Sequence, residues 1–599
     1  MEVKMMLITN QQVYESFIKG AHTVIERKEV LNRINVFPVR DGDTGSNLSS
    51  MMRSIIEMAE NKISVKTTLE SVADAALYGA RGNSGIIFAQ YFRGLSESIQ
   101  GDETVSVIDF AMACQSAARY AYEAVENPVE GTMITVMREW GNVLTDECKK
   151  HTTLAEIFKN ALCQVELALE RTKEQMPLLK KANVVDSGAK GFTYFIEGAI
   201  YYLMNGEILP QKTQTDELIV PEFIEESEHK DSGEYRYCTE CLIEGTQMMP
   251  EEIKEWLHGM GNSVVVAGSA NKCKVHVHTD APSRVFDYLY DKGNIIYQKV
   301  DDMFRQEAIV NHRKHKIALV TDSIADLPKE WVDEEQVHVV HLDILYKNHT
   351  YLDKLTIQPE QILKKCAEGN ELPTSSQPGP KTIENLLDYL MNYYESIIIL
   401  TVSKELSGTY NSFANGIKKI ADTNKKISLI NTKQNSGAQG LLVKKCSELI
   451  SAGMSHEEIV QEIEYLTNQS KILVQVRNIE HMIRSGRLSV RAGKIAKMVG
   501  MKPIITLDEE GKGILDGIAF SVSGSSRKLI HHIRKVCKAD QIEQYSIVHV
   551  NNLMEAEHLG RVMTEIIGSQ PSYICETSSI IAISAGEGAI AISYLLKRR

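Results

Sequence analysis

The chain has 599 residues, of which 43% are hydrophobic and 24% charged, and 66 basic against 79 acidic residues give a formal net charge of −13. This length predicts roughly three to five domains, and the composition is that of a soluble globular protein. The acidic charge, without a long basic run, argues against a nucleic-acid partner. The sequence starts without a signal-peptide pattern, lacks an apolar stretch of membrane-spanning length, and its ten cysteines form no dense framework. We therefore expect a cytosolic protein.

The first segment, residues 1–205, shows helical periodicity. Apolar residues recur at the spacing of one helical face after the loop at 35–47, and the stretches 107–125, 153–171 and 188–204 repeat the pattern. Strand-like alternation is scarce, so we predict an all-α bundle. Residues 206–235 contain two prolines and many acids with little periodicity, which is typical of a linker.

The two later segments mix strands with helices. Residues 236–312 predict a small α+β domain, with strands in NSVVVAGS, CKVHVHTD and NIIYQKV and helices at 249–260 and 282–291. Residues 314–599 alternate helices with apolar runs, which favours α/β units with parallel strands. The predicted strands of this third segment are KIALVTDS, SIIILTVS, KISLINTK, KILVQVR, KPIITLD and YSIVHVN.

The densest polar motif of the chain is NVFPVRDGDTGSN at residues 35–47. Asp41 and Asp43 flank a glycine just before a predicted helix, and Mg²⁺ prefers one or two carboxylates with water and phosphate as its other ligands. The helix start near Gly45 offers free backbone N–H groups to an anion. An Asx-rich turn that caps a helix would also explain the motif.

Three further glycine-containing loops adjoin apolar helices. They are GARGNSG at 79–85, PVEGTM at 128–133 and VDSGAKG at 185–191, and together with the first motif they predict one site at the end of the bundle. The conventional G-x-x-x-x-G-K-[ST] loop is absent. The Gly586–Gly588 stretch imitates a dinucleotide fingerprint, but a βαβ unit does not follow it.

With these motifs the first segment resembles the nucleotide-binding domain of dihydroxyacetone kinases and, more closely, the kinase subunit of bacterial fatty acid kinase. The resemblance implies ATP and Mg²⁺ as cofactors, with Asp41 and Asp43 as the catalytic acidic residues. Asn35 stands where dihydroxyacetone kinases have an Asp ligand, and Arg40 replaces a proline beside the metal loop. The nucleotide contacts that the resemblance implies are Thr44, Asn47, Gly82, Asn83, Ser84, Thr132, Met133, Asp186 and Gly188.

In the second segment, Lys274-Val-His276-Val-His278 places two imidazoles on one face of a strand. Cys238 lies upstream, and zinc accepts sulfur and imidazole ligands in tetrahedral sets, so Cys238, His276 and His278 form a candidate zinc site. A hydrogen-bonded histidine pair in a half-buried sheet would also explain the spacing. The segment resembles the middle domain of the fatty acid kinase subunit, which implies a structural zinc ion on these residues and a homodimer.

In the third segment, hydroxyl-rich loops and arginines follow predicted strands, and such loops suit a small anionic group. The phrases TDSIADLP, TSSQP, LSGTYNS and IRSGRL resemble the DegV family, which binds fatty acids between two α/β lobes. The resemblance implies that Ser375, Ser407, Gly408 and Arg487 bind the substrate. Ser584 and Glu587 stand where the family commonly has a His and a Pro.

Joined in one chain, these resemblances imply ATP-dependent phosphorylation of a fatty acid carboxylate, with the acyl phosphate passing to a membrane acyltransferase. The covalent link would raise the effective concentration of the lipid carrier near the kinase. Three alternatives stay open. They are a kinase of a small hydroxyketone such as dihydroxyacetone, a non-catalytic fatty-acid carrier or sensor regulated by nucleotide, and a kinase of a different carboxylate.

Overall fold

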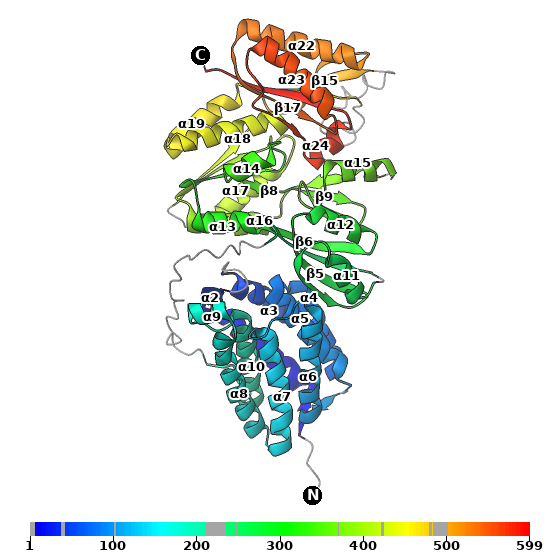
Figure 1. Ribbon diagram of the computed structural model, residues 1–599, viewed down its shortest axis with the longest axis vertical. Helices are drawn as coiled ribbons and strands as arrows, with labels where there is room; N and C mark the ends of the chain where they lie inside the picture. The colour runs from blue at the N-terminus through cyan, green and yellow to red at the C-terminus, as the bar shows by residue number, and fades with distance from the viewer. Residues whose placement is uncertain are drawn as a thin grey trace. The chain divides into compact units, whose positions relative to one another are not determined.

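The computed structural model describes residues 6–36, 42–100, 103–151, 153–210, 234–246, 248–368, 371–420, 425–477, 482 and 501–598 (Figure 1). The chain divides into two compact units, Met1–Gln306 and Glu307–Arg599. None of the helices within these described ranges is long and apolar enough to cross a bilayer.

The first unit begins with the predicted helical bundle. Thr9, Ser64, Ser106 and Thr153 cap the helices that follow them by accepting a hydrogen bond from a backbone N–H of the first turn. A short antiparallel pair of strands, in which Leu7 lies opposite Ser106, is an addition to the all-α prediction. The elements are β1 (Leu7–Thr9), α1 (Asn10–Glu26), α2 (Lys28–Arg33), α3 (Thr44–Met58), α4 (Val65–Gly79), α5 (Gly82–Ser98), β2 (Thr104–Ser106), α6 (Val107–Ala124), α7 (Met133–Lys150), α8 (Leu154–Gln175), α9 (Pro177–Ala182) and α10 (Ser187–Asn205).

The small middle part of this unit is an antiparallel sheet in the order β4-β5-β3-β6. Leu242, Val265 and Ala267 of the sheet are buried in the same hydrophobic core as the helical bundle. The N–H of Gly268 also donates to Gln90 Oε1 of α5 at 2.9 Å. The elements are β3 (Tyr237–Glu244), α11 (Pro250–Leu257), β4 (Asn262–Gly268), β5 (Lys272–Thr279), α12 (Pro282–Tyr290) and β6 (Asn294–Asp302). The boundary between the two units falls within the next helix, α13 (Met303–Asn311).

The second unit has two lobes. The first lobe holds the parallel strands that the sequence predicts, and they form a sheet in the order β13-β12-β7-β8. A smaller antiparallel sheet in the order β10-β9-β11 extends this lobe. The elements are β7 (Ile317–Asp322), α14 (Lys329–Glu334), β8 (His338–Val340), β9 (Asp343–Tyr346), β10 (His349–Leu352), α15 (Pro359–Glu368), β11 (Thr374–Ser376), α16 (Pro380–Tyr393), β12 (Ser396–Thr401), α17 (Thr409–Lys419), β13 (Lys426–Asn431), α18 (Ser436–Ser451) and α19 (His456–Thr467).

The second lobe holds a mixed sheet in the order β16-β15-β14-β19-β17-β18. Only β17 and β18 run parallel among its described strand pairs, so the expectation of parallel strands throughout is wrong here. A tight turn at Asp508–Lys512 joins β15 to β16 as a hairpin, and a hairpin forces antiparallel pairing. The elements are β14 (Ser470–Gln475), β15 (Lys502–Leu507), β16 (Gly513–Ala519), α22 (Val522–Ala539), β17 (Ile542–His549), α23 (Leu553–Ile567), β18 (Tyr573–Glu576), α24 (Ser579–Ala585) and β19 (Ile590–Leu596).

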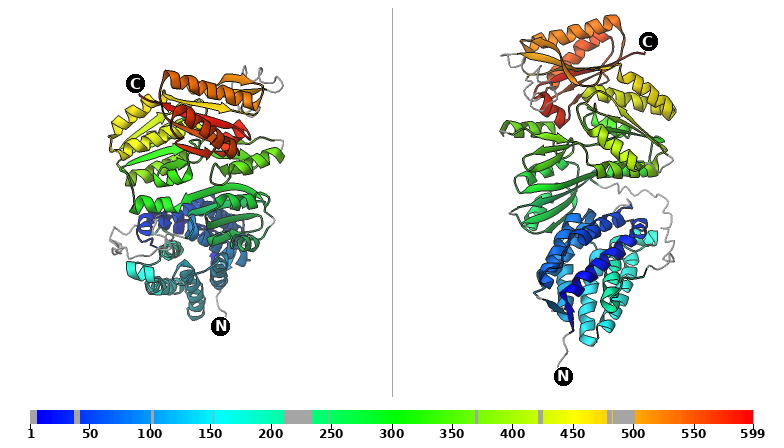
Figure 2. Two further views of the ribbon diagram at one scale, coloured as in Figure 1. Left: turned by 45° about the horizontal axis from the view of Figure 1, so that its top comes forward. Right: turned by 180° about the vertical axis from the view of Figure 1, so that it is seen from behind.

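Helix α18 lies between the two large sheets of the second unit. Its Leu442 and Cys446 pack in one core with the first sheet, while Ala438 and Leu441 pack with Ile472 and other residues of the second sheet. Helices α22 and α23 lie side by side and cover this second sheet (Figure 1, Figure 2). The two lobes therefore share α18 as a common helical layer, and this layer holds the two sheets in place on either side of it.

Helix α7 approaches α6 so closely at Gly141 that a side chain has no room there. A Cβ on Gly141 would lie 2.7 Å from the backbone N and 2.8 Å from the Cα of Gln115. We expect Gly141→Ala to lower the free energy of unfolding of the first unit by ~1–3 kcal/mol, because backbone atoms cannot move aside as a side chain can. The matched control is Gly259→Ala, because no heavy atom of the described chain lies within 4 Å of that Cβ. Thermal unfolding followed by circular dichroism measures both, and equal melting temperatures would contradict the close approach.

Candidate functional site

Four helices of the first unit begin at one place. These are α3, α5, α7 and α10, which start at Thr44, Gly82, Met133 and Ser187. A Cβ on Gly82 would lie 2.8 Å from Asn47 Nδ2, and a Cβ on Gly188 would lie 3.0 Å from Ser84 Oγ and 3.5 Å from Met133 Cβ. A helix N-terminus carries free N–H groups and positive partial charge, so four of them together favour a polyanion such as a chain of phosphates.

A cavity adjoins these helix starts, and we call it the first-unit cavity. It brings together motifs that were predicted from the sequence as separate sites. The helical bundle contributes one wall and the middle sheet contributes the other. The lining residues are Asn35, Asp43, Thr44, Asn47, Gly82, Asn83, Ser84, Cys238, Glu240, His276, His278, Lys299, Asp301, Met303 and Gln306.

The remaining nucleotide candidates lie beside this cavity rather than on its lining. Asp186 is buried at the N-cap of α10, where its Oδ2 accepts a hydrogen bond from Ala189 N at 2.7 Å, and burial raises the pKa of its carboxyl to about 6. The Thr132 hydroxyl donates to Val129 O at 2.7 Å. Asp41 falls outside the described residues, so the predicted Mg²⁺ ligands with a defined position are Asn35 and Asp43.

Strand pairing brings together Cys238, His276 and His278, which we call the Cys–His cluster of the first-unit cavity. In the register of β3 and β5, Cys238 lies opposite His278 and Glu240 lies opposite His276. Because alternate residues of a strand share a face, all four side chains point to the same side of the sheet. The possible ligand atoms of Cys238, His276 and His278 all lie within 4.8 Å of one another, and Cys238 Sγ is 3.8 Å from His276 Nδ1.

Several buried polar atoms around this cavity lack a hydrogen-bond partner among the described residues. They are Asn83 Oδ1, Ser187 Oγ, Glu240 Oε2, Lys274 Nζ and His276 Nε2. Buried polar atoms are rarely left without a partner in native proteins, so this group of atoms would suit a bound ligand or ion.

The donor set fits a zinc ion. One sulfur and two imidazole nitrogens are ligands that Zn²⁺ prefers in tetrahedral sites, and three protein ligands leave a fourth position open. Burial lowers the pKa of His278 to about 3, so this imidazole is neutral and able to bind a metal. Burial also raises the pKa of the Cys238 thiol well above its usual value, so metal binding would have to displace the thiol proton.

Four charged residues at this place were not predicted from the sequence, namely Glu240, Lys274, Lys299 and Asp301. Glu240 follows Cys238 by two residues, so strand alternation was the signal that could have found it. Lys299 and Asp301 lie on β6 opposite Glu240 and Cys238, and only the sheet register reveals that pairing. Lys299 Nζ contacts the carboxylate of Asp301.

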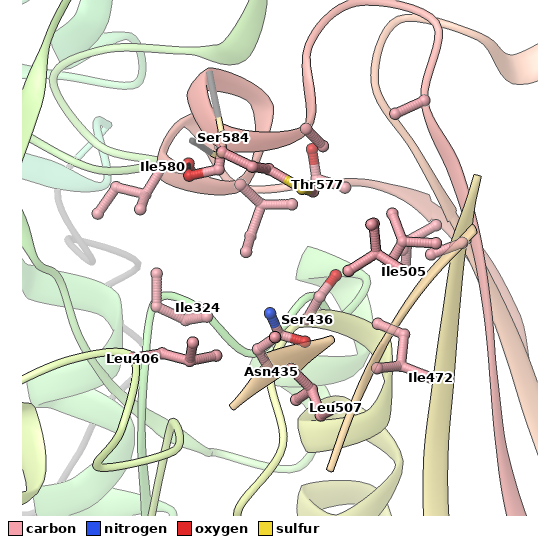
Figure 3. Close-up of a pocket in the computed structure, with 18 of the residues that line it drawn as sticks. Ile324, Leu406, Asn435, Ser436, Ile472, Ile505, Leu507, Thr577, Ile580 and Ser584 are labelled. Carbon is pink, nitrogen blue, oxygen red and sulfur yellow. Dashed lines mark hydrogen bonds between the residues drawn. The ribbon is translucent and has the colours of Figure 1, made fainter. Parts of the chain in front are cut away.

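The second unit holds a mostly apolar cavity between its lobes, here named the second-unit cavity. In Figure 3, Thr577 and Ser584 lie on one side of it, and Asn435 and Ser436 lie across from them. Side chains from both lobes enclose the space. The lining residues are Ile324, Leu342, Val402, Leu406, Ser407, Asn435, Ser436, Ile472, Val474, Met482, Ile505, Thr506, Leu507, Gly513, Val548, Val550, Thr577, Ile580, Ile581, Ser584, Ala585, Ala589, Ile590 and Ala591.

The predicted substrate-binding residues differ in their relation to this cavity. Ser407 lines it, and its hydroxyl lies 2.8 Å from that of Thr409. Ser375 lies on β11 and is not one of the lining residues. The loop after β11 nevertheless meets Gly408, because a Cβ there would overlap Gln377 Oε1. Arg487 falls outside the described residues.

Two polar atoms in the second-unit cavity are buried without a hydrogen-bond partner in the described part of the chain. They are Thr577 Oγ1 and Asn435 Oδ1, and neither belongs to a motif that was recognised in the sequence. Ser584 donates its hydroxyl hydrogen to Ile580 O at 3.0 Å. The atoms best placed to meet a polar head group are therefore on Thr577 and Asn435.

Helix α24, which forms one wall of the second-unit cavity, is held by buried carboxylates of the first lobe. Asp326 Oδ1 accepts from Ser578 N at 2.7 Å, and Asp353 Oδ1 accepts from Ser579 N at 2.8 Å. Lys354 Nζ lies 3.1 Å from Asp326 Oδ1 and balances part of this negative charge. A buried carboxylate at a helix N-terminus satisfies free N–H groups and the helix dipole, so these bonds fix where α24 begins.

Comparison with known families assigns the parts of the chain. Residues 38–201 match the DAK2 domain, and residues 234–310 match the FakA-like middle domain of fatty acid kinase. Residues 316–597 match the family described as uncharacterised protein, DegV family. The chain therefore carries a DAK2 domain, a FakA-like middle domain and a DegV domain, and the resemblances and fold classes stated from the sequence are confirmed.

Individual relatives cover parts of the chain. The uncharacterized protein SSP1546 of Staphylococcus saprophyticus is 32% identical over 314 residues, and Protein YloV of Bacillus subtilis is 31% identical over 316 residues. These alignments take in 50% and 51% of this chain and 56% and 57% of the relatives, so the chain spans little more than half the length of these curated relatives.

Some solved structures are similar to about half of the chain. The fatty acid binding DegV family protein SAG1342 of Streptococcus agalactiae is 25% identical with a TM-score of 0.44, covering 48% of this chain and 100% of that structure. DegV, a fatty acid binding protein from Bacillus subtilis, is 25% identical with a TM-score of 0.43, covering 47% of this chain and 100% of that structure.

We expect the full chain to bind one Zn²⁺ per chain and to lose it in Cys238→Ser and His278→Ala, because each variant removes a ligand atom of the cluster. Cys241→Ala is the matched control, since Cys241 lies on the same strand but faces the other side of the sheet. Metal content after dialysis, measured by mass spectrometry, reports the result. Equal zinc in Cys238→Ser and the wild-type protein would rule out this cluster as the site.

Proposed function

We propose that the protein uses Mg-ATP to phosphorylate the carboxylate of a fatty acid held in the second-unit cavity, with an acyl phosphate as product. The observation that carries the proposal is the convergence of four helix N-termini beside one cavity, which the starts of α3 and α5 line, in a chain that also encloses an apolar cavity with polar atoms in its wall. The DAK2 domain implies nucleotide use, and the middle and DegV domains support a reaction related to that of fatty acid kinase.

Nucleotide phosphates would lie at the starts of α3, α5, α7 and α10, where backbone N–H groups donate to their oxygens. Asp41 and Asp43 would hold Mg²⁺, and Cys238, His276 and His278 would hold Zn²⁺. When bound, these ions would neutralise phosphate charge and supply a Lewis acid. Because the cluster lines the same cavity as the starts of α3 and α5, we assign it a catalytic role in place of the structural role expected from sequence.

The chemical step needs little covalent help from the protein. A carboxylate oxygen forms a bond to the γ-phosphorus while the bond from that phosphorus to the β,γ-bridging oxygen breaks, so ADP leaves. A fatty acid is ionised at neutral pH, which makes a general base dispensable. Positioning and charge neutralisation dominate such a transfer. The apolar walls of the second-unit cavity would bury the acyl chain and leave the head group to polar atoms such as Thr577 Oγ1.

The resemblance extends the proposal beyond the chain itself. A homodimer formed through the middle domain and a membrane acyltransferase that receives the acyl phosphate both follow from it, as does a cytosolic location. A dihydroxyacetone-type kinase, a nucleotide-regulated carrier and a kinase of another carboxylate remain the competing functions. The substitution at Ser584 bears on the last, because the imidazole that the family commonly places there is missing.

We expect purified protein with Mg²⁺ to release ADP from ATP only when a long-chain fatty acid is added, and Asp43→Asn to lower this rate by about 100-fold because it removes a charged metal ligand. Asp146→Asn is the control, since Asp146 is exposed on α7 and pairs with Lys149. Coupled ADP detection gives the rate, and hydroxylamine traps the acyl phosphate as a hydroxamate.

The other outcomes of this assay each identify a competing function. ADP release that depends on dihydroxyacetone rather than on fatty acid would identify a hydroxyketone kinase. Turnover only with another carboxylic acid would identify that acid, and not a fatty acid, as the substrate. Tight binding of both nucleotide and fatty acid without turnover would identify a carrier or sensor and would contradict the proposed kinase activity.

We expect Thr577→Val to weaken fatty acid binding by about tenfold, because it removes a hydroxyl that has no other partner in the described chain and would donate to the carboxylate. Thr506→Val is the matched control in the same cavity, since the Thr506 hydroxyl already donates to Ile472 O at 2.7 Å. Displacement of a fluorescent fatty acid measures both. Equal losses in the two variants would show that Thr577 does not meet the head group.

A further inference from the structure

Glu240 joins the two walls of the first-unit cavity through a single oxygen. Its Oε1 accepts a hydrogen bond from Gly82 N at 2.6 Å and lies 3.3 Å from His276 Nδ1. Gly82 belongs to the helical bundle and precedes Glu240 by 158 residues, whereas His276 belongs to the Cys–His cluster. The Glu240 side chain is 1% exposed, so both contacts form away from bulk water.

On the bundle side, Glu240 occupies the start of α5. Arg81, at the N-cap position, makes no side-chain capping bond among the described residues, and Gly82 takes a φ of +60° that favours glycine. The carboxylate from β3 therefore caps a helix of another part of the unit. That position is also one of the four helix starts where the proposed nucleotide phosphates would bind, so Glu240 and a phosphate would compete for the same N–H group.

On the sheet side, Glu240 belongs to a group of charges around the metal cluster. Lys299 lies opposite Glu240 on β6, and Lys274 lies on β5, so the two strands that flank its carboxylate each bring a positive charge. A metal cation held by Cys238, His276 and His278 would add positive charge beside the same carboxylate. Such a cation attracts Glu240 and offsets its repulsion of phosphate.

We propose that Glu240 is a positioning residue that couples the Cys–His metal cluster to the nucleotide loop. Without metal its carboxylate caps α5 and opposes nucleotide phosphate, and a cation on the cluster draws it away from Gly82 and frees that N–H group. This inference rests on the proposed function, because it takes the start of α5 to be a phosphate site. Linkage then requires that zinc and nucleotide raise each other's affinity by the same factor.

The test measures MgADP affinity by isothermal titration calorimetry in the wild-type full chain and three variants. The wild-type protein and Glu240→Gln are each studied after chelator treatment and after loading with Zn²⁺. Glutamine keeps the shape and an acceptor oxygen but removes the charge. The matched control is Glu244→Gln, four residues along the same strand, where the carboxylate is half-exposed and pairs with Lys272. In Cys238→Ser, which lacks a cluster ligand, zinc should have no effect.

We expect zinc to strengthen MgADP binding to the wild-type protein by about tenfold. Metal-free Glu240→Gln should already bind MgADP about as tightly as the zinc-loaded wild-type protein, and zinc should then change its affinity by less than about twofold. Glu244→Gln should respond to zinc as the wild-type protein does. An equal zinc effect in Glu240→Gln and the wild-type protein, or weaker binding in metal-free Glu240→Gln, would overturn the coupling.

A second measurement needs no variant. Hydrogen exchange of the peptide that covers residues 79–88 should become faster when Zn²⁺ alone is added, because Gly82 N loses its partner, and slower when MgADP follows. Unchanged or slower exchange with zinc alone would overturn the coupling. If MgADP affinity changes neither with zinc nor with the substitution at Glu240, the coupling is overturned and the proposed function stands. If MgADP binds to none of the proteins, both the coupling and the proposed function are overturned.

Discussion

The pairing of β3 with β5 is the constraint on which the first unit's chemistry depends. It sets Cys238 opposite His278 and Glu240 opposite His276, and it turns all four side chains toward the helix starts of the bundle. A slip of one residue would turn the set on β3 to the other face of the sheet. Leu242 points to this same face and is buried in the core of the bundle, so the hydrophobic pattern that docks the sheet also specifies the register of the polar cluster.

Periodicity explains how much of the fold was predictable. The helical spacing of Leu48, Met51, Met52, Ile55 and Ile56 predicts a buried helix face, and α3 buries all of them except Ile56, which is partly buried. The spacing of His276 and His278 likewise places them together before any sheet is seen. What periodicity cannot supply is the merger of the cluster with the phosphate loops, because Gly82 and Glu240 meet only through the packing of bundle and sheet. The antiparallel pairing of β19 was not predicted because Ile590–Leu596 was not among the predicted strands.

The second-unit cavity shows a different limit of prediction from sequence. Its walls are apolar residues of ordinary strands and helices, and the phrase around Ser407 marks only one edge of it. Thr577 and Asn435 are conspicuous only because their oxygens lack partners once burial is known in the described chain. Thr577 stands among the polar residues Glu576, Ser578 and Ser579, so nothing in the sequence singles it out. Asp326 and Asp353, which position the helix beside it, are buried but look like surface acids in the sequence.

The place of β19 in the second sheet has a consequence for how the protein is made. This strand lies between β14 and β17, although it follows every other strand of the sheet in the chain. While the ribosome is still adding residues before Ile590, β14 and β17 each expose an unpaired edge, and the cavity lacks Ile590 and Ala591 from its wall. A nascent chain would therefore carry open, aggregation-prone strand edges until β19 has been synthesised, and chaperones that cover such edges would protect it until then.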